Sequence, residues 1–143
     1  MSATGLGLGR IFNVVPAASG VHIPLTRGSA VSFVTFEDDG STIITLKESV
    51  DGASEQALTV ITEVHKGPGI GGTWTQVTQT AAATYDLADD TTNDAVVLTV
   101  RADQLSDGFN SVEATVDGGT CYAIVHDLLV GRVPANLSSS IVA

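Results

Sequence analysis

Cysteine, positive charge and long apolar runs are scarce in this sequence of 143 residues. Cys121 is the single cysteine, which excludes a disulfide within the chain. Its neighbours at 120–125 form an apolar stretch typical of a strand, so we predict a buried and unreactive thiol. No apolar run suits a transmembrane helix, and the first residues lack the basic and apolar regions of a signal peptide. We therefore expect synthesis and folding in a cytoplasm.

The shortage of cations excludes two kinds of partner. Six Lys and Arg residues stand against 16 Asp and Glu residues, which gives a net charge of −10. Nucleic acid and anionic membrane surfaces attract clustered positive charge, so we expect neither as a partner. Hydrophobic residues make up 43% of the chain, too large a share for a disordered protein, and the length suits one domain.

The sequence does contain a series of short apolar segments separated by glycine and acidic turns. None of these segments is long enough for a substantial helix, and their composition is typical of strands. The pattern predicts an all-β fold, an antiparallel β-sandwich or small barrel of jelly-roll or immunoglobulin-like type. We predict strands at residues 10–15, 21–25, 30–37, 41–48, 56–66, 73–79, 84–87, 95–102, 109–116 and 120–131.

Turn sequences indicate how some of these strands pair. Asp51-Gly52 lies within a hairpin-type connection at residues 50–54. Residues 117–119 form a second turn, and we expect strands 109–116 and 120–131 to pair across it. Pro24 places its strand at a sheet edge, because proline lacks the N–H that a central strand needs.

The two ends of the chain differ from its middle. Residues 1–9 are small and glycine-rich, and residues 132–143 contain Pro134 and three consecutive serines. We predict an N-terminal arm at 1–9, a β-domain at 10–131 and a C-terminal arm at 132–143. The aromatic residues of the domain are expected in its core: Phe33, Phe36, Trp74, Tyr85 and Phe109.

The sequence shows no recognisable catalytic or metal-binding motif. His22, His65 and His126 are far apart, without the spacing of a zinc helix motif, and we interpret them as polar strand positions. A Gly-x-Ser-x-Gly nucleophile motif is missing. Aspartates in the acidic turns offer oxygen ligands for calcium, but aspartate and glycine are also ordinary turn residues, and we prefer that interpretation. We therefore predict no enzyme activity, no cofactor and no metal.

Four segments carry a resemblance to a known class of protein. They are residues 31–36, residues 45–53 with 56–58, residues 72–78, and residues 98–105 with 108–112. In overall pattern the chain resembles small structural proteins of tailed bacteriophages, especially capsid decoration (cement) proteins. The likeness covers roughly residues 31–130, most of the chain. No functional residue is carried over, because no defining motif is matched.

The resemblance implies a non-enzymatic virion protein, made in the host cytoplasm, that binds the outer capsid surface and stabilises it. Its partners would be the major capsid protein and other copies of itself, with a trimer among the open arrangements. Arms can lie along neighbouring subunits or add to their sheet edges. We predict the contact residues in the two arms and the 67–72 loop: Leu6, Leu8, Arg10, Ile70, Arg132, Val133, Leu137 and Ile141.

Three alternatives stay open at this point. The first is a structural protein of the phage tail or of the head–tail connector, where related β-domains also occur. The second is a carbohydrate-binding module for host attachment, with Trp74 as its test residue. The third, with the least support, is a small hydrolase that uses His and Asp from different strands.

Overall fold

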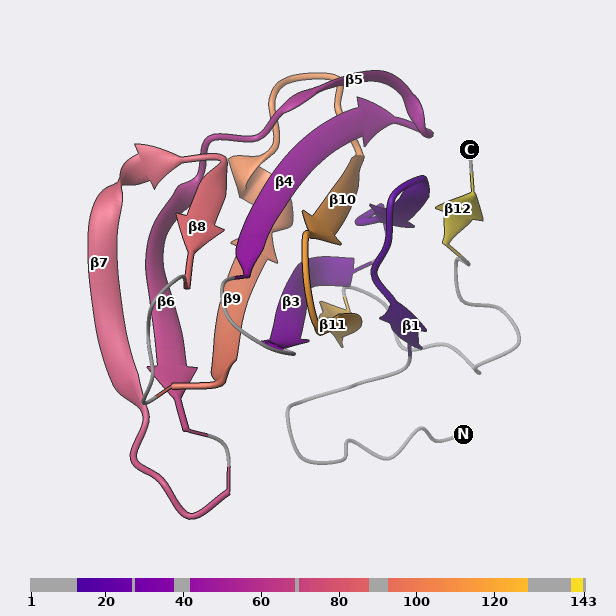
Figure 1. Ribbon diagram of the computed structural model, residues 1–143. Helices are drawn as coiled ribbons and strands as arrows, with labels where there is room; N and C mark the ends of the chain where they lie inside the picture. The colour runs from indigo at the N-terminus through magenta and orange to yellow at the C-terminus, as the bar shows by residue number, and fades with distance from the viewer. Residues whose placement is uncertain are drawn as a thin grey trace.

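The protein is a two-layer antiparallel β-sandwich. The structure, a computed structural model, describes residues 13–26, 28–37, 42–68, 70–87, 93–128 and 140–142. Figure 1 shows the two sheets, with β4 and β8 of one sheet crossing in front of β6 and β9 of the other. The prediction of an all-β sandwich is confirmed. The described residues contain no α-helix, only a short 3₁₀ turn, η1 (Ala102–Gln104).

The first sheet has six strands in the order β1-β11-β3-β9-β6-β7. All its neighbouring strands are antiparallel. Strand β3 lies at its centre, paired with β11 on one side and β9 on the other. The strands are β1 (Asn13–Pro16), β3 (Gly28–Phe36), β6 (Ile61–Gly67), β7 (Thr75–Ala82), β9 (Ala95–Arg101) and β11 (Thr120–Leu128).

The second sheet has the order β12-β2-β10-β4-β5. Strand β8 also pairs with β4, antiparallel to its first residues. Strand β4 is long and curved in Figure 1, and it carries β10 along one edge and β5 and β8 along the other. The strands are β2 (Val21–Pro24), β4 (Ile43–Val50), β5 (Ala53–Ala57), β8 (Thr84–Asp86), β10 (Ser111–Val116) and β12 (Ile141–Val142).

The core lies between the sheets and follows from the two-residue period of each strand. Val31 and Phe33 of β3 are fully buried and alternate with residues of the opposite face. From the second sheet, Ile44 and Leu46 of β4 pack into the same cluster. Burying apolar side chains of this size stabilises the fold by roughly 1.5–3 kcal/mol each.

The chain crosses between the sheets more often than the turn sequences indicate. The predicted pairing of 109–116 with 120–131 is wrong, because β10 pairs with β2 and β4 while β11 pairs with β1 and β3. The predicted single strand at 56–66 is also wrong. Residues 58–60 interrupt it, and β5 and β6 belong to different sheets.

Most other local predictions are confirmed with small shifts in boundaries. The Asp51-Gly52 hairpin joins β4 to β5, and both residues have positive φ angles, 51° and 87°. The predicted edge position of the Pro24 strand is wrong, because β2 lies between β12 and β10, although the two-residue β12 pairs with it only at Val21 and His22. Proline is therefore tolerated there, since no β12 residue faces it.

The end of the chain departs from the predicted arm. Ile141 and Val142 form β12 and pair with β2, so this part of the 132–143 segment returns to the second sheet. Ile141 is half-buried opposite His22, and Val142 is exposed. The predicted N-terminal arm at 1–9 lies outside the described residues.

Candidate binding surface

Part of the outer face of the first sheet is apolar, although an exposed sheet face is usually polar. Antiparallel sheets normally alternate apolar residues toward the core with polar residues toward water. Here Val14, Phe36 and Tyr122 are exposed by 57%, 45% and 41%, and the side chains of all three point away from the core. Exposed apolar residues that gather on one face indicate an interaction surface, whereas scattered ones do not.

The strand register brings these side chains together. Tyr122 of β11 is opposite Val34 of β3, and Val34 is opposite Val97 of β9. In the next row Phe36 of β3 is opposite Ala95 of β9. Val34 and Val97 are half-buried, so they add apolar surface between the aromatic rings.

Trp74 completes the surface from the loop before β7. A Cβ atom on Gly67 would lie 2.7 Å from Cδ2 of the Trp74 ring, so the indole packs directly on the backbone of Gly67. Gly67 is opposite Ala95, which in turn is opposite Phe36. Small residues at 67 and 95 therefore leave room for the indole near Phe36. We call Phe36, Trp74 and Tyr122 the aromatic platform.

The sequence prediction placed Phe36 and Trp74 in the core, and this is wrong for both, since Trp74 is 44% exposed and Phe36 45%. Phe33 and Tyr85 are buried as predicted, and Phe109 is half-buried. One signal for the platform was available. Residues 31–36 carry apolar side chains on both faces of the strand, and such a pattern is expected where both faces of a sheet are covered.

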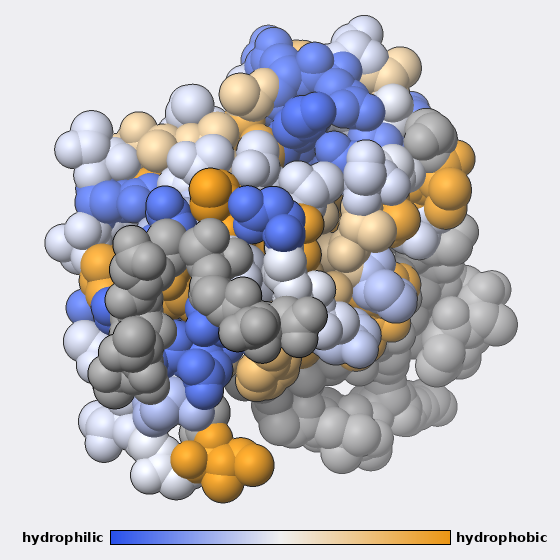
Figure 2. All heavy atoms as spheres, in the orientation of Figure 1, coloured by the Kyte–Doolittle hydropathy of each residue, from blue (hydrophilic) through white to orange (hydrophobic). Residues whose placement is uncertain are grey.

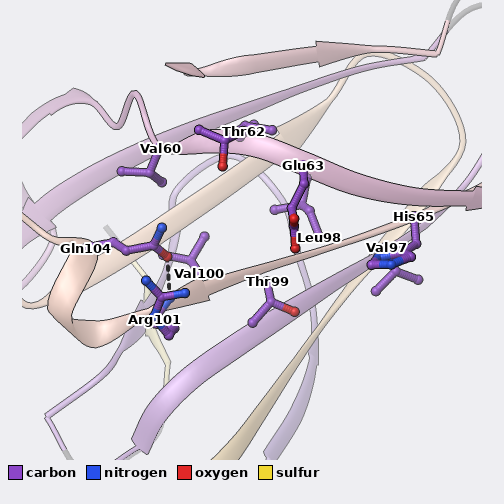
Figure 3. Close-up of a pocket in the computed structure, with 11 residues that line it drawn as sticks. Val60, Thr62, Glu63, His65, Val97, Leu98, Thr99, Val100, Arg101 and Gln104 are labelled. Atoms are coloured by element: carbon purple, nitrogen blue, oxygen red, sulfur yellow. Dashed lines mark hydrogen bonds between the residues drawn. The ribbon is translucent and has the colours of Figure 1, made fainter. Parts of the chain in front are cut away.

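A groove opens beside the platform, between β6 and β9. These strands pair only where His65–Gly67 faces Val97–Ala95, and beyond that point they separate. The resulting groove has a volume of about 370 Å³. Figure 3 shows Thr62, Glu63 and His65 on one side and Thr99 and Arg101 on the other, with Gln104 accepting a hydrogen bond from the Arg101 backbone N–H. The lining is mixed in polarity, unlike the platform.

A serine, a histidine and an aspartate form a hydrogen-bonded chain on the same outer face. Ser32 Oγ lies 2.8 Å from His126 Nε2, and His126 Nδ1 lies 2.8 Å from Asp127 Oδ2. Thr99 Oγ1 also lies 2.8 Å from Ser32 Oγ. The order of atoms is that of a Ser-His-Asp triad, although His126 and Asp127 are adjacent on one strand.

The surroundings of Ser32 do not suit a nucleophile. Ser32 lies in the middle of β3 with paired strands on both sides, so the backbone N–H groups around it are engaged in the sheet. An acyl-transfer site needs free N–H donors directed at the developing oxyanion. We therefore interpret the three residues as a hydrogen-bond network that fixes β11 against β3.

The predicted contact residues fall into three groups. Ile70 is fully exposed in the loop between β6 and β7, and Figure 2 shows hydrophobic surface at the tip of that loop. Ile141 lies in β12 on the second sheet, away from the platform. The other six lie outside the described residues: Leu6, Leu8, Arg10, Arg132, Val133 and Leu137.

Two side chains away from this face have shifted pKa values. Burial raises the pKa of the Cys121 thiol, which is 2% exposed, so the predicted buried thiol is confirmed. Burial also acts to raise the pKa of Glu48. Hydrogen bonds from the Ser106 backbone N–H, the Ser106 hydroxyl and the Gln56 amide outweigh it, so the pKa of Glu48 lies below its ordinary value.

Comparison with known proteins adds no identification. No family model, curated protein or solved structure matches the chain. In the part of the chain that the structure describes, no helix has the length and apolarity needed to cross a bilayer.

Proposed function

We propose that this chain is a non-enzymatic structural protein of a phage virion, and that it binds the outer surface of the capsid and stabilises it. The observation that carries the proposal is the aromatic platform, Phe36, Trp74 and Tyr122, on the outer face of the first sheet. The resemblance to decoration proteins supplies the capsid as the partner.

The chemistry of the platform favours a protein partner. Its neighbours across the strands are mostly apolar, Val34, Val97 and Ala95, with the Thr120 hydroxyl opposite Phe36 as the exception. Sugars present hydroxyl groups that need hydrogen-bond partners, whereas protein interfaces gain most from aromatic anchors in a dry apolar patch. Each apolar Å² removed from water contributes about 25 cal/mol before the costs of association are subtracted.

Repetition strengthens such a contact in a shell. A decoration protein meets many identical sites, and linked or oligomeric copies gain avidity without further contacts. Self-association and a role for the two arms, residues 1–9 and 132–143, remain part of the proposal. Extended arms would add contacts to neighbouring subunits around the platform.

Co-sedimentation with empty capsids from the phage that encodes the chain tests the proposal. The double substitution Phe36→Ser and Tyr122→Ser should weaken binding at least about tenfold, because it removes two apolar anchors. Val50→Ser is the matched control, since Val50 is 37% exposed on β4 of the other sheet and lies outside both arms. Thermal unfolding of each variant shows whether its fold is retained.

The outcomes separate the proposal from its rivals. Equal binding by the double variant and the wild type would exclude the platform, and failure of the wild type to bind capsids would exclude the decoration role. Binding to tails or connectors instead would place the same domain there. Specific binding to a glycan array, lost on Trp74→Ala, would identify a carbohydrate-binding module instead.

A further inference from the structure

A group of polar side chains is buried on the outer face of the second sheet. His22 of β2, Ser49 of β4 and Ser111 of β10 are 0% exposed, and Glu113 of β10 is 2% exposed. Ile23, Leu46 and Val112 of the same strands point into the core, so the polar residues point to the opposite face of the sheet. Buried polar groups normally have hydrogen-bond partners, and an exception calls for an explanation.

His22 provides that exception. Its Nε2 atom is buried and has no hydrogen-bond partner. Glu55 Oε1 of β5 lies 3.6 Å from this nitrogen, too far for a hydrogen bond. His22, Glu55 and Glu113 each direct one donor atom into the same space, and these three atoms lie within 4.8 Å of one another.

Surrounding groups hold these donors in place. Ser49 Oγ lies 3.2 Å from His22 Nδ1, so the hydroxyl fixes the ring and leaves Nε2 directed at the carboxylates. Glu113 accepts a hydrogen bond from the backbone N–H of Gly20. Lys47 Nζ lies 3.5 Å from Glu55 Oε2, which leaves Oε1 of the same carboxylate facing His22.

We propose that His22 Nε2, Glu55 and Glu113 bind one divalent first-row metal ion, with Zn²⁺ as the representative. An imidazole nitrogen with two carboxylates suits zinc and its neighbours, whereas calcium and magnesium take oxygen ligands alone. Ligand bonds of about 2.0–2.2 Å place donors about 3–4 Å apart around one ion. The 3.6 Å separation of His22 Nε2 and Glu55 Oε1 matches this spacing.

The bound ion joins three strands of the second sheet. His22 lies on β2, Glu113 on β10 and Glu55 on β5, and β4 separates β10 from β5. Figure 2 shows hydrophilic surface over the β4–β5 hairpin, and Glu55 is 36% exposed, so solvent reaches the site from this side. Three protein ligands leave a fourth position of a tetrahedral ion for water or another donor.

Thermal unfolding of the metal-free full-length protein, with and without ZnCl₂, tests this site. A ligand that binds only the folded state at a hundred times its Kd shifts the folded-to-unfolded ratio about 100-fold. For a chain of this size, that corresponds to a rise in Tm of roughly 5–10 °C. Native mass spectrometry should show one zinc ion per chain.

Variants separate this site from adventitious binding. Glu55→Gln and Glu113→Gln keep the side-chain size, and both should abolish the zinc-dependent rise in Tm. Glu55 is the more informative position, because its exposure allows the variant to fold even if Glu113→Gln does not. His65→Gln, at an exposed histidine of the first sheet, is the control and should retain the full rise.

A Co²⁺ spectrum provides a second measurement. Cobalt bound by His22 and two carboxylates should give visible d–d absorption that zinc displaces and that Glu55→Gln loses. No zinc-dependent change in Tm of the wild type would overturn the proposal. So would a rise in Tm that Glu55→Gln retains and His65→Gln loses, because it would place the ion on the first sheet.

Discussion

Glu48 should stabilise the fold through a buried carboxylate, and substitutions there test the polar contacts of the sandwich. The side chain is 1% exposed. It accepts hydrogen bonds from the Ser106 backbone N–H at 2.8 Å, from the Ser106 hydroxyl and from Gln56 Nε2. These contacts tie β4 to β5 and to the loop after η1.

The expected loss follows from the number of partners. Hydrogen bonds to a charged group contribute about 1.5–3 kcal/mol each. Ser106 and Gln56 are exposed, so water can satisfy their donors after the substitution and limits the loss. The contributions are not additive, so Glu48→Ala should lower the free energy of unfolding by about 2–4 kcal/mol. Glu48→Gln should cost about 1–2 kcal/mol, because the Ser106 hydroxyl can rotate and the Gln56 amide can flip.

The pH dependence has a definite sign. The pKa of Glu48 in the folded state lies below its ordinary value of 4.5. The stabilisation by the carboxylate is therefore complete above about pH 4.5, and it is lost as the pH falls through the folded-state pKa. The difference in stability between wild type and Glu48→Gln should shrink over the same range.

Urea unfolding near pH 7 and near pH 3 measures these differences directly. Glu63→Gln is the matched control, because Glu63 is exposed and accepts a hydrogen bond from Gln76; it should change stability by no more than about 0.5 kcal/mol. Wild-type stability in Glu48→Ala, or a loss in Glu48→Gln that is the same at both pH values, would refute the reasoning.

Three further predictions concern separate parts of the fold. Gly119→Ala should lower the free energy of unfolding in urea by at least about 2 kcal/mol, because Gly119 has a φ of +75° and a Cβ atom would lie 2.0 Å from the Phe36 carbonyl oxygen. Gly108→Ala is the control and should cost only about 1 kcal/mol, because Gly108 has a φ of +84° but open space around it. Equal losses in the two variants would contradict this. Cys121 should resist a thiol reagent such as DTNB until the protein is unfolded, and rapid reaction of the native protein would show that the thiol is accessible. A fluorophosphonate probe should leave Ser32 unlabelled, and labelling that His126→Ala abolishes would establish a nucleophile and hence a hydrolase.

Local patterns predict the fold class and several strands, but they do not predict how the chain moves between sheets. The segment 31–36 and the Asp51-Gly52 turn are recognisable because two-residue periodicity and positive φ leave marks in the sequence. The turn at 117–119 has the composition of a hairpin, yet it connects the two sheets. Turn residues specify a change of direction, and burial on both sides decides which strand becomes the neighbour.

The candidate sites show the same limit. His22, Glu55 and Glu113 lie 33 and 58 positions apart, so no spacing rule connects them before the strands are paired. The exposure of Phe36 and Trp74 likewise depends on the first sheet having one uncovered face. Aromatic residues in strands are usually core residues, and only the strand register distinguishes a platform from a core.

Cryo-electron microscopy of the phage particle that carries this chain tests the central claim most directly. The proposal predicts many copies on the shell, with the outer face of the first sheet against the major capsid protein and the rings of Phe36, Trp74 and Tyr122 buried in the contact. Copies whose platform faces solvent, or a mature particle without the chain, would contradict it.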